Sequence, residues 1–410
     1  MISVDEALHI ILSKAKPLAI RTVPFKDACG YALAENIVSR EMIPPWDNSG
    51  VDGYAVIASD TSKTKQPCML KVLDTVHAGD VSTKKLTAGT AIQIMTGAPV
   101  PRGTTAIVMV EHTRRVGQWV HIQKPAREGD HIRKAGSDIQ KNQIVFSRDH
   151  IIRPYDLGVL ASIGKSKIRI QTKPTIALLA TGDELLSVEE KLKPGKIRAS
   201  THFALTALLQ KAGYPVINLG IAHDTPKAIA AQIQKALKAD VIITTGGVSM
   251  GEKDYVRQAV EKAGIKIHFW KVRQKPGKPM VFGSKGKKLF FGLPGNPVSS
   301  LVCFELYVTP AIARMASQPS PILRIPVRLD NPVSKKPGLR HFLRARLYIH
   351  DGQIKASLSG EQSSGVLSHM AYAQALLDIP ENDGDKNKND TVDAVVLDRD
   401  HLNQLIISIL

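Results

Sequence analysis

The chain has 410 residues, of which 43% are hydrophobic and 22% charged, so two to four folded domains are expected rather than one. Its 55 Lys and Arg against 37 Asp and Glu give a net charge of +18, which favours an anionic partner. The basic residues are scattered and aromatics make up only 5%, which disfavours a nucleic-acid binder. No apolar run approaches the roughly 18 residues of a membrane span, and the three cysteines show no metal-binding spacing, so we expect a soluble cytoplasmic protein without zinc.

The N-terminal part of the chain predicts a linking domain that is interrupted by a β-rich domain. Residues 1–16 carry apolar residues on one face, acids early and lysines late, which indicates an amphipathic helix rather than a signal peptide. Residues 44–143 alternate short apolar runs with Gly, Pro and Asp turns, which is typical of strands. A helix is predicted again over 151–163, so residues 1–43 and 144–173 are expected to form one domain around the insertion.

Residues 174–319 show the strand–helix alternation of a doubly wound α/β domain. Residues 175–180 form a continuous apolar run, as expected for a strand buried on both faces. Further strands are predicted at 215–219, 240–245, 265–270 and 288–291. A long helix is predicted to begin at Pro297. Residues 320–410 return to short strands, which predicts a small C-terminal β-barrel or sandwich domain.

Four glycine- or acid-bearing loops follow the strands of the α/β domain. Ligands of open α/β sheets bind beyond the carboxyl ends of the strands, so these loops are expected to share one edge. Their glycines allow backbone N–H groups to converge on an anion, and a following helix adds its positive end. The loop residues assigned to substrate binding are Thr181, Gly182, Asp224, Gly246, Gly247, Ser249, Pro294, Asn296 and Pro297. Each loop alone is more often only an ordinary turn, and Asp183 is explained equally well as an acid in the first turn of a helix.

The same rim is predicted to carry carboxylates and lysines. Glu184, Asp224 and Asp254 would repel a phosphate unless a divalent cation such as Mg²⁺ lies between them. Lys275 and Lys278 supply ammonium groups for oxyanions. The GxxxxGK[ST] and GxGxxG patterns are absent, which disfavours a Walker-type ATPase and a dinucleotide-binding fold. The loops together therefore predict an enzyme that binds a phosphate-bearing anion.

Three polar turns of the β-rich segment place an acid or a hydroxyl beside glycine. They contain Asp52, Thr96 and Asp138. Any one of them is explained by an ordinary β-turn. Three such turns predict a second wall of the site, contributed from another domain or another subunit.

These segments resemble the molybdopterin molybdenumtransferases, the molybdenum insertases related to the E domain of gephyrin. The matching segments are PPWDNSGVDGYAV (44–56), IMTGAPVPRG (94–103), IRKAGSDI (132–139), KPTIALLATGDEL (173–185), TTGGVSMGEKDYV (244–256), KPGKPMVFG (275–283), FFGLPGNPVSS (290–300), LRHFLRARL (339–347) and GEQSSGVLSHMA (360–371). They follow the family order over nearly the whole chain. The resemblance therefore implies a four-part architecture: a linking domain, an inserted β-rich domain, a molybdopterin-binding α/β domain and a C-terminal β-barrel.

The resemblance also implies a reaction and its residues. Adenylylated molybdopterin binds, its phosphoanhydride to AMP is hydrolysed, and molybdate is inserted with the help of Mg²⁺ or another divalent cation. The implied catalytic residues are Asp52, Thr96, Asp138, Glu184 and Asp254, of which Asp52, Glu184 and Asp254 would hold the metal. The family works as a homodimer, and a molybdopterin adenylyltransferase and a molybdoenzyme or chaperone are the other candidate partners.

The chain departs from the family pattern at two places. Ser137 stands where the family usually has Glu, and Ser200-Thr201 where it usually has Ser-Asn. Both changes bear on pterin or metal contacts. The alternative is a non-catalytic pterin-binding or scaffold protein of the same fold, but a scaffold has no need of the retained acids.

Overall fold

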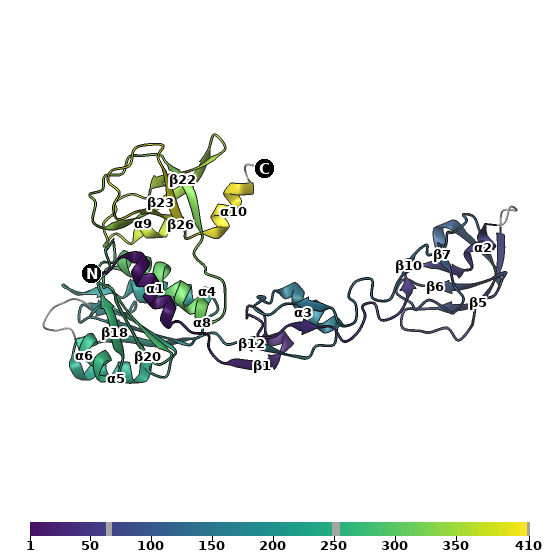
Figure 1. Cartoon of the computed structure of the whole chain (residues 1–410), viewed down its shortest axis with the longest axis horizontal. Helices are drawn as coiled ribbons and strands as arrows, with labels where there is room; N and C mark the ends of the chain where they lie inside the picture. The colour runs from purple at the N-terminus through teal and green to yellow at the C-terminus, as the bar shows by residue number, and fades with distance from the viewer. Residues whose placement is uncertain (63–67, 248–254, 408–410) are drawn as a thin grey trace. The chain divides into compact units, whose positions relative to one another are not determined.

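The computed structural model describes residues 1–62, 68–247 and 255–407. Its contacts divide the chain into two compact units, each with its own hydrophobic clusters, and both units are discontinuous in sequence (Figure 1). The α/β unit comprises Met1–Arg21, Gly30–Ala32 and Ile170–Leu410, and the β-rich unit comprises Thr22–Cys29 and Leu33–Arg169. The chain passes between the units within β1 (Ile20–Pro24) and β12 (Lys167–Gln171).

A six-stranded sheet forms the centre of the β-rich unit. In spatial order its strands are β7 (Ala106–Met109), β4 (Gly53–Val56), β6 (Thr90–Ile94), β5 (Cys68–Val76), β9 (Trp119–Ile122) and β8 (Thr113–Val116). Only the β5–β6 pair is parallel among these neighbours. In β4, Tyr54 and Val56 join one hydrophobic cluster, whereas Ala55 joins another on the opposite side. This period of two confirms the predicted β-rich fold of the segment.

Shorter elements complete the β-rich unit. They are η1 (Phe25–Asp27), β2 (Ile37–Val38), β3 (Asn48–Ser49), α2 (Ala58–Thr61), η2 (Val110–His112), β10 (Ile132–Arg133), β11 (Ile144–Phe146) and α3 (Pro154–Ser162). At the start of α3 the Asp156 carboxylate accepts a hydrogen bond from the Arg153 backbone N–H at 2.9 Å. This cap, with Pro154 in the first turn, fixes where the predicted helix begins.

A second six-stranded sheet lies at the centre of the α/β unit. In spatial order its strands are β16 (Val216–Ala222), β13 (Ile176–Thr181), β17 (Val241–Thr245), β21 (Lys288–Leu293), β20 (Val281–Lys285) and β18 (Lys266–Trp270). The first four are parallel, and β20 and β18 are antiparallel to their neighbours. Every residue of β13 is buried, which explains its uninterrupted apolar sequence.

Helices cover both faces of this sheet, which confirms the doubly wound α/β fold (Figure 1). On one face, α5 (Pro226–Ala236) and α6 (Tyr255–Lys262) pack through residues such as Ile233 and Val260. On the other face lie α1 (Val4–Lys14), α4 (Ser200–Lys211) and the helix that begins at Pro297.

The long helix predicted from Pro297 is present as Pro297–Met315, but it is not α-helical throughout. It consists of α7 (Pro297–Cys303), a π-helical turn η3 (Phe304–Val308) and α8 (Thr309–Met315). Pro310 has no N–H to donate to the preceding turn, which accounts for a widened turn there. Within the part of the chain that is described, this is the one helix long and apolar enough to cross a membrane, but 83% of that stretch is buried in the fold, so core packing explains its composition.

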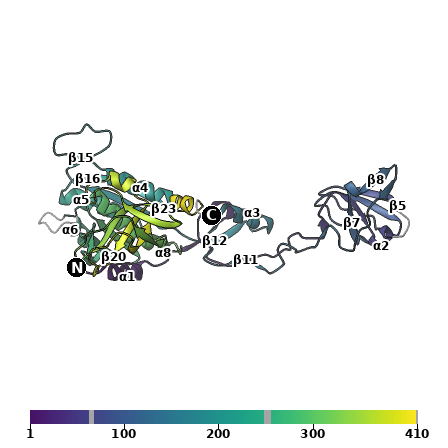
Figure 2. The same ribbon diagram turned by 90° about the horizontal axis from the view of Figure 1, so that it is seen from above.

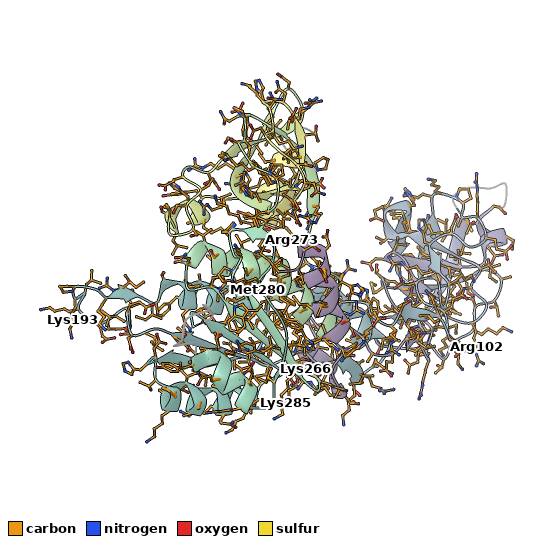
Figure 3. The ribbon with its side chains drawn as sticks, turned by 60° about the vertical axis from the view of Figure 1, so that its left-hand side comes forward. Arg102, Lys193, Lys266, Arg273, Met280 and Lys285 are labelled. Atoms are coloured by element: carbon orange, nitrogen blue, oxygen red, sulfur yellow. The ribbon has the colours of Figure 1, made fainter. Side chains whose placement is uncertain are left out.

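An arm interrupts the path from β13 to α4. β14 (Leu185–Leu186) and β15 (Ile197–Arg198) pair at its base, and the residues between them extend away from the sheet (Figure 2). Lys193 lies at the tip of the arm (Figure 3). Asp183 therefore precedes a strand, so its interpretation as an acid in the first turn of a helix is wrong.

Lysines close the carboxyl ends of three helices at the other edge of the sheet. Lys288 Nζ donates to a carbonyl just after α5, and Lys285 Nζ to one just after α6, both at 2.7 Å. Lys173 Nζ lies 3.4 Å from the carbonyl that follows α4. Ammonium groups at these positions satisfy unpaired carbonyls and oppose the negative ends of the helix dipoles.

The C-terminal strands form a closed five-stranded barrel rather than a sandwich. Around the barrel they run β23 (Arg340–His350), β24 (Gln353–Leu358), β22 (Arg324–Leu329), β26 (Thr391–Val396) and β25 (Ala375–Ile379), and a β23–β25 pairing closes the ring. Side chains such as Val327, Leu347 and Leu377 fill its interior. The short strand β19 (Gln274–Lys275) extends this sheet, and α9 (Ser368–Ala371) and α10 (Arg399–Ile407) accompany it.

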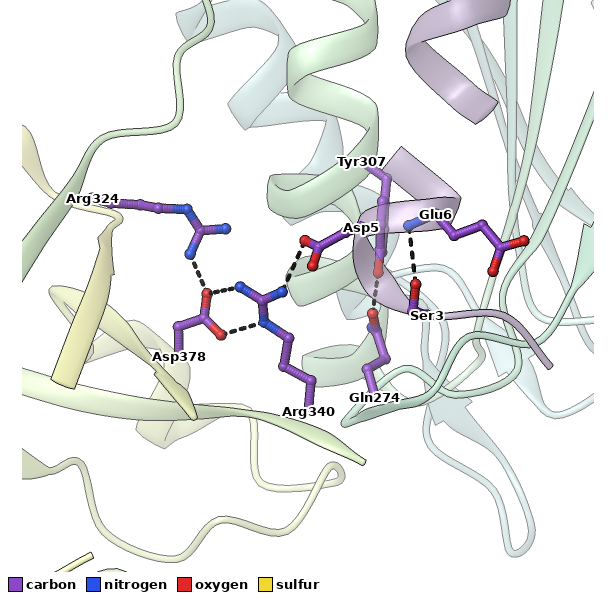
Figure 4. Close-up of polar contacts among 8 residues, drawn as sticks. All are labelled: Ser3, Asp5, Glu6, Gln274, Tyr307, Arg324, Arg340 and Asp378. Carbon is purple, nitrogen blue, oxygen red and sulfur yellow. Dashed lines mark hydrogen bonds and ion pairs between the residues drawn. The ribbon is translucent and has the colours of Figure 1, made fainter. Parts of the chain in front are cut away.

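Charged groups join the barrel to the α/β domain (Figure 4). The buried carboxylate of Asp378 in β25 accepts hydrogen bonds from Arg340 Nε at 2.6 Å and Nη2 at 2.8 Å, and from Arg324. Arg340 also pairs with Asp5 of α1 at 2.9 Å. Barrel residues such as Phe342 belong to the same hydrophobic cluster as α1 and α8, so barrel and α/β domain share one core.

Candidate functional site

Three loops meet at the carboxyl edge of the parallel strands. A Cβ on Gly246 would lie 2.5 Å from the carbonyl oxygen of Thr181, and one on Gly295 would lie 3.7 Å from Gly246 Cα. Gly182 has φ +150°, and a side chain there would meet the Glu184 carboxylate at 2.5 Å. At Gly246, where φ is +86° and a Cβ would strike backbone, the packing requires glycine, and the structure brings together the loops after β13, β17 and β21 as the sequence predicts.

A small cavity lies among these loops. Its volume is about 50 Å³. The predicted site residues that line it are Thr181, Glu184 and Pro297; Thr201, His202, Thr245 and Gly295 are among its other lining residues. Gly182, Gly246 and Gly247 lie in the loops that form the surrounding rim. The cavity therefore opens among the loops to which the sequence assigns substrate binding.

Acids from two loops lie close together beside this cavity. Asp183 accepts hydrogen bonds from the backbone N–H of Asp224 at 3.1 Å and from His223 Nδ1 at 3.2 Å, and these donors lower its pKa. The pKa of Asp224 is raised by its burial and by the negative charges of Asp183 and Glu184. Like charges thus accumulate at the rim, which a bound cation would relieve.

The predicted metal site is only partly assembled by these residues. The carboxylates of Asp183, Glu184 and Asp224 are of the type that Mg²⁺ prefers. Between residues 1–62, 68–247 and 255–407, however, no group of three His, Cys, Asp or Glu side chains is arranged to hold a metal. Asp254 and Ser249, which the sequence assigns to the site, lie outside the described residues.

The predicted lysines line a separate groove of about 650 Å³ next to the start of α7. Lys275 and Lys278 line it together with Asn296 and Ser299. Asn296 precedes Pro297 at the helix start, as predicted, but its side chain makes no capping hydrogen bond. The Asn296 carboxamide is therefore not engaged in capping the helix.

The barrel contributes residues to this groove that the site prediction missed. Gln362, Ser363 and Ser364 line it. Their loop is held by Arg344, which is 1% exposed and donates to the carbonyl oxygen of Ser363 at 3.1 Å and to that of Glu361. These residues lie in two of the segments that match the family pattern, and that match is the feature of the sequence from which they could have been predicted.

Pro294 has a structural part in the same region. Its carbonyl oxygen accepts a hydrogen bond from the Ser300 hydroxyl, and the backbone N–H of Val298 donates to Ser364 O at 3.3 Å. The first turn of α7 is thereby attached both to the loop after β21 and to the barrel.

Two of the three predicted residues of the β-rich unit contact one another. The exposed Asp52 carboxylate accepts hydrogen bonds from the backbone N–H of Thr96 at 2.6 Å and from its hydroxyl at 2.7 Å, and both lower the pKa of Asp52. A Cβ on Gly53 would strike the carbonyl of Val108, so the turn needs glycine after Asp52. Asp138 lies in another turn, where its backbone N–H donates to Ile43 O at 3.0 Å and its side chain is exposed.

Family models match three consecutive parts of the chain. The model for the MoeA N-terminal region (domain I and II) matches residues 2–164, the model "Probable molybdopterin binding domain" matches residues 177–314, and the model for the MoeA C-terminal region (domain IV) matches residues 326–397.

Curated relatives match nearly the whole chain. The molybdopterin molybdenumtransferase of Haemophilus influenzae is 34% identical over 403 residues, which cover 96% of this chain and 98% of that protein. The Bacillus subtilis protein of the same name is 33% identical over 387 residues, covering 92% and 90%. The crystal structure of a molybdopterin biosynthesis MoeA protein from Pyrococcus horikoshii superposes with a TM-score of 0.83 at 30% identity, covering 97% of this chain and 99% of that one. The chain belongs to the MoeA family of molybdopterin molybdenumtransferases.

Proposed function

We propose that this chain is a transferase of molybdenum cofactor biosynthesis that inserts molybdate into adenylylated molybdopterin and releases AMP. Relatives that match over nearly their full length carry the name molybdopterin molybdenumtransferase. The observation that carries the proposal is the meeting of three glycine loops, an acidic rim and a two-lysine groove at one end of the α/β unit.

The groove supplies the groups that oxyanions require. Lys275 and Lys278 are charged donors, and Ser299 and Ser363 are lining residues that carry hydroxyls. The backbone that carries Lys275 is anchored because β19 pairs with the barrel, and the serine loop is held by Arg344. Charged and hydroxyl donors on such a frame can stabilise the developing charge of a phosphoryl or molybdate oxygen.

A divalent cation fits the acidic rim by charge and ligand type. Glu184 and, from the sequence pattern, Asp52 and Asp254 are the residues that we assign to Mg²⁺ or a similar ion. The ion would polarise the phosphoanhydride and offset the negative charge of the substrate. The pKa of Asp224 is raised first by burial and then by the negative charges of Asp183 and Glu184, and this second contribution supports the assignment.

We further propose that the chain acts in the cytoplasm as a homodimer, in which the β-rich unit of one subunit supplies Asp52, Thr96 and Asp138 to the α/β unit of the other. The exposed carboxylates of Asp52 and Asp138 support this, since neither belongs to the core of its own unit. A molybdopterin adenylyltransferase and a molybdoenzyme or its chaperone are the proposed partners for substrate delivery and cofactor release.

The test is a single-turnover assay with adenylylated molybdopterin, Mg²⁺ and molybdate, in which AMP release and activation of a cofactor-free molybdoenzyme are both measured. We expect stoichiometric AMP release and activation. Asp52→Ala is expected to abolish both while the adenylylated pterin remains bound. Binding by the unmodified chain without AMP release would support the non-catalytic alternative, and full activity of Asp52→Ala would contradict the role of that acid.

A further inference from the structure

A buried histidine lies beside the small cavity of the candidate site. His202, in the first turn of α4, is 4% exposed and lines the cavity together with Thr181 and Glu184. Its Nε2 lies 2.7 Å from Oδ1 of Asn218 in β16. Neither the family pattern nor the sequence assigned a role to this residue.

The hydrogen bonds of Asn218 determine which ring nitrogen carries the proton. The backbone N–H of Gly220 donates to Asn218 Oδ1 at 2.8 Å, which identifies that atom as the carboxamide oxygen. An oxygen of this kind only accepts, so His202 Nε2 must be the N–H donor. Nδ1 of the neutral ring is then a bare acceptor.

This acceptor has no partner in the described part of the chain. His202 Nδ1 is fully buried and makes no hydrogen bond. Burial also lowers the pKa of His202, so the ring stays neutral and Nδ1 keeps its lone pair at neutral pH. Buried acceptors of native proteins are normally satisfied, and an exception calls for a donor from outside the chain.

The cavity restricts what that donor can be. Its volume of about 50 Å³ holds an amino group or a few atoms at the edge of a ring, but not a whole bicyclic ring. The proposed substrate contains two nitrogen heterocycles, a pterin and an adenine, and both carry an exocyclic amino group. A neutral acceptor suits such a group, because it recognises N–H without adding charge to an already acidic rim.

We propose that His202 is a specificity residue whose Nδ1 accepts a hydrogen bond from an N–H group of the substrate's nitrogen heterocycle. This inference rests on the proposed function for the identity of the ligand. The geometry that supports it is the combination of a proton fixed on Nε2, a bare buried Nδ1 and a cavity among the substrate loops.

Two substitutions test the roles of Nδ1 and Nε2 of His202 separately. In His202→Gln the carboxamide nitrogen reaches the place of Nε2 and can still donate to Asn218, but the acceptor at Nδ1 is lost. In His202→Asn the carboxamide oxygen stands near the place of Nδ1, so the cavity keeps an acceptor while the bond to Asn218 is lost. Thermal unfolding of both variants reports whether the fold is retained.

The measurement is the dissociation constant of two separate probes, AMP and non-adenylylated molybdopterin, by titration calorimetry at pH 7.5. We expect His202→Gln to weaken one probe at least 10-fold and His202→Asn to remain within about threefold of the unmodified chain. The probe that is weakened identifies which heterocycle His202 contacts. In the AMP-release assay, His202→Gln should raise KM and leave kcat nearly unchanged.

Several outcomes would overturn the inference. Equal affinities of His202→Gln and the unmodified chain for both probes would show that a water molecule satisfies Nδ1. An equal loss of probe affinity in both variants would show that His202 acts only by connecting α4 to β16 through its hydrogen bond to Asn218. Failure of the unmodified chain to bind either probe would also overturn it. Because the probes are bound without turnover, absent AMP release would contradict the proposed function alone.

Discussion

The Asp52 carboxylate accepts both of its hydrogen bonds from a single residue, Thr96. A substitution of Thr96 therefore tests the role of the carboxylate without removing it. The hydroxyl and the backbone N–H of Thr96 stabilise the ionised form and lower the pKa of Asp52. Both residues are exposed, so a change here reports on chemistry rather than on folding.

Thr96→Val should therefore raise the pKa of Asp52 by removing one donor. We expect the acidic limb of the pH profile of AMP release to move to higher pH, while the rate at neutral pH changes little because Asp52 stays ionised there. The pH profile of single-turnover AMP release measures this. Thr96→Ser is the matched control and should restore the profile, whereas an unshifted profile in Thr96→Val would show that the hydroxyl does not tune Asp52.

Among the elements, the π-helical turn η3 carries a glutamate, Glu305, with a strongly raised pKa. Glu305 in this turn faces a cavity of about 430 Å³ that is also lined by Lys211 and Arg399. Burial raises the pKa of Glu305 to about 7, well above the usual value of a glutamate. No ion pair with either base is present in the described residues, so its ionised form is disfavoured in the fold.

Glu305→Gln should stabilise the chain at pH 8 and change little at pH 5. The folded chain binds more protons than the unfolded chain between about pH 4.5 and 7, so the charge penalty is complete above pH 7 and disappears as the pH falls to 4.5. We expect a gain of about 1–3 kcal/mol at pH 8, measured by urea unfolding at both pH values. A loss at pH 8 would mean that Lys211 or Arg399 compensates the carboxylate.

Element by element, the sequence predicts best where burial controls the pattern. The buried strand β13 and the helix α3 are predicted correctly because each pattern depends on neighbouring residues. The arm after Asp183 was missed because its strands, β14 and β15, have two residues each and leave no periodicity. The change from α-helix to a π-helical turn at η3 depends on a single proline, and the apolar pattern of the sequence does not reveal it.

At the scale of the whole molecule, the C-terminal strands could form a barrel or a sandwich. The pairing of β23 with β25 decides between the two, and the local sequence pattern does not encode that pairing. The ring closes only because β23 pairs with both β24 and β25. The same limit applies to the site: the loop residues were predicted from glycines and acids, whereas His202 and the serine loop held by Arg344 enter it through tertiary packing. Asp52, Thr96 and Asp138 stay predictions as residues of a shared site.

Asp378 is the buried acid that holds Arg324 and Arg340 within the barrel, and Arg340 continues to Asp5 of the α/β domain, so the charge of Asp378 should matter for the stability of both. Asp378→Asn leaves Arg324 and Arg340 without their common buried partner, and we expect a loss of about 3–5 kcal/mol in the free energy of unfolding. Denaturant unfolding followed by far-UV circular dichroism measures this.

The control is Asp393→Asn, which changes an exposed residue of β26 directly opposite Asp378. It should alter stability by about 0.5 kcal/mol or less. Because barrel and α/β domain share one hydrophobic cluster, Asp378→Asn should lower one common transition rather than reveal a separate one for the barrel. An early, separate barrel transition in the unmodified chain would contradict this.

The place of α1 in the core has a consequence for synthesis of the chain on the ribosome. Its buried face, which includes Ile11, packs against α8, and the backbone N–H of Leu18 donates to Met315 O at 3.0 Å. These partners emerge about 300 residues after α1, which at roughly 5–20 residues per second is about 15–60 s later. The first helix to leave the ribosome is thus among the last to find its place, and its apolar face must be shielded from other nascent chains for most of translation.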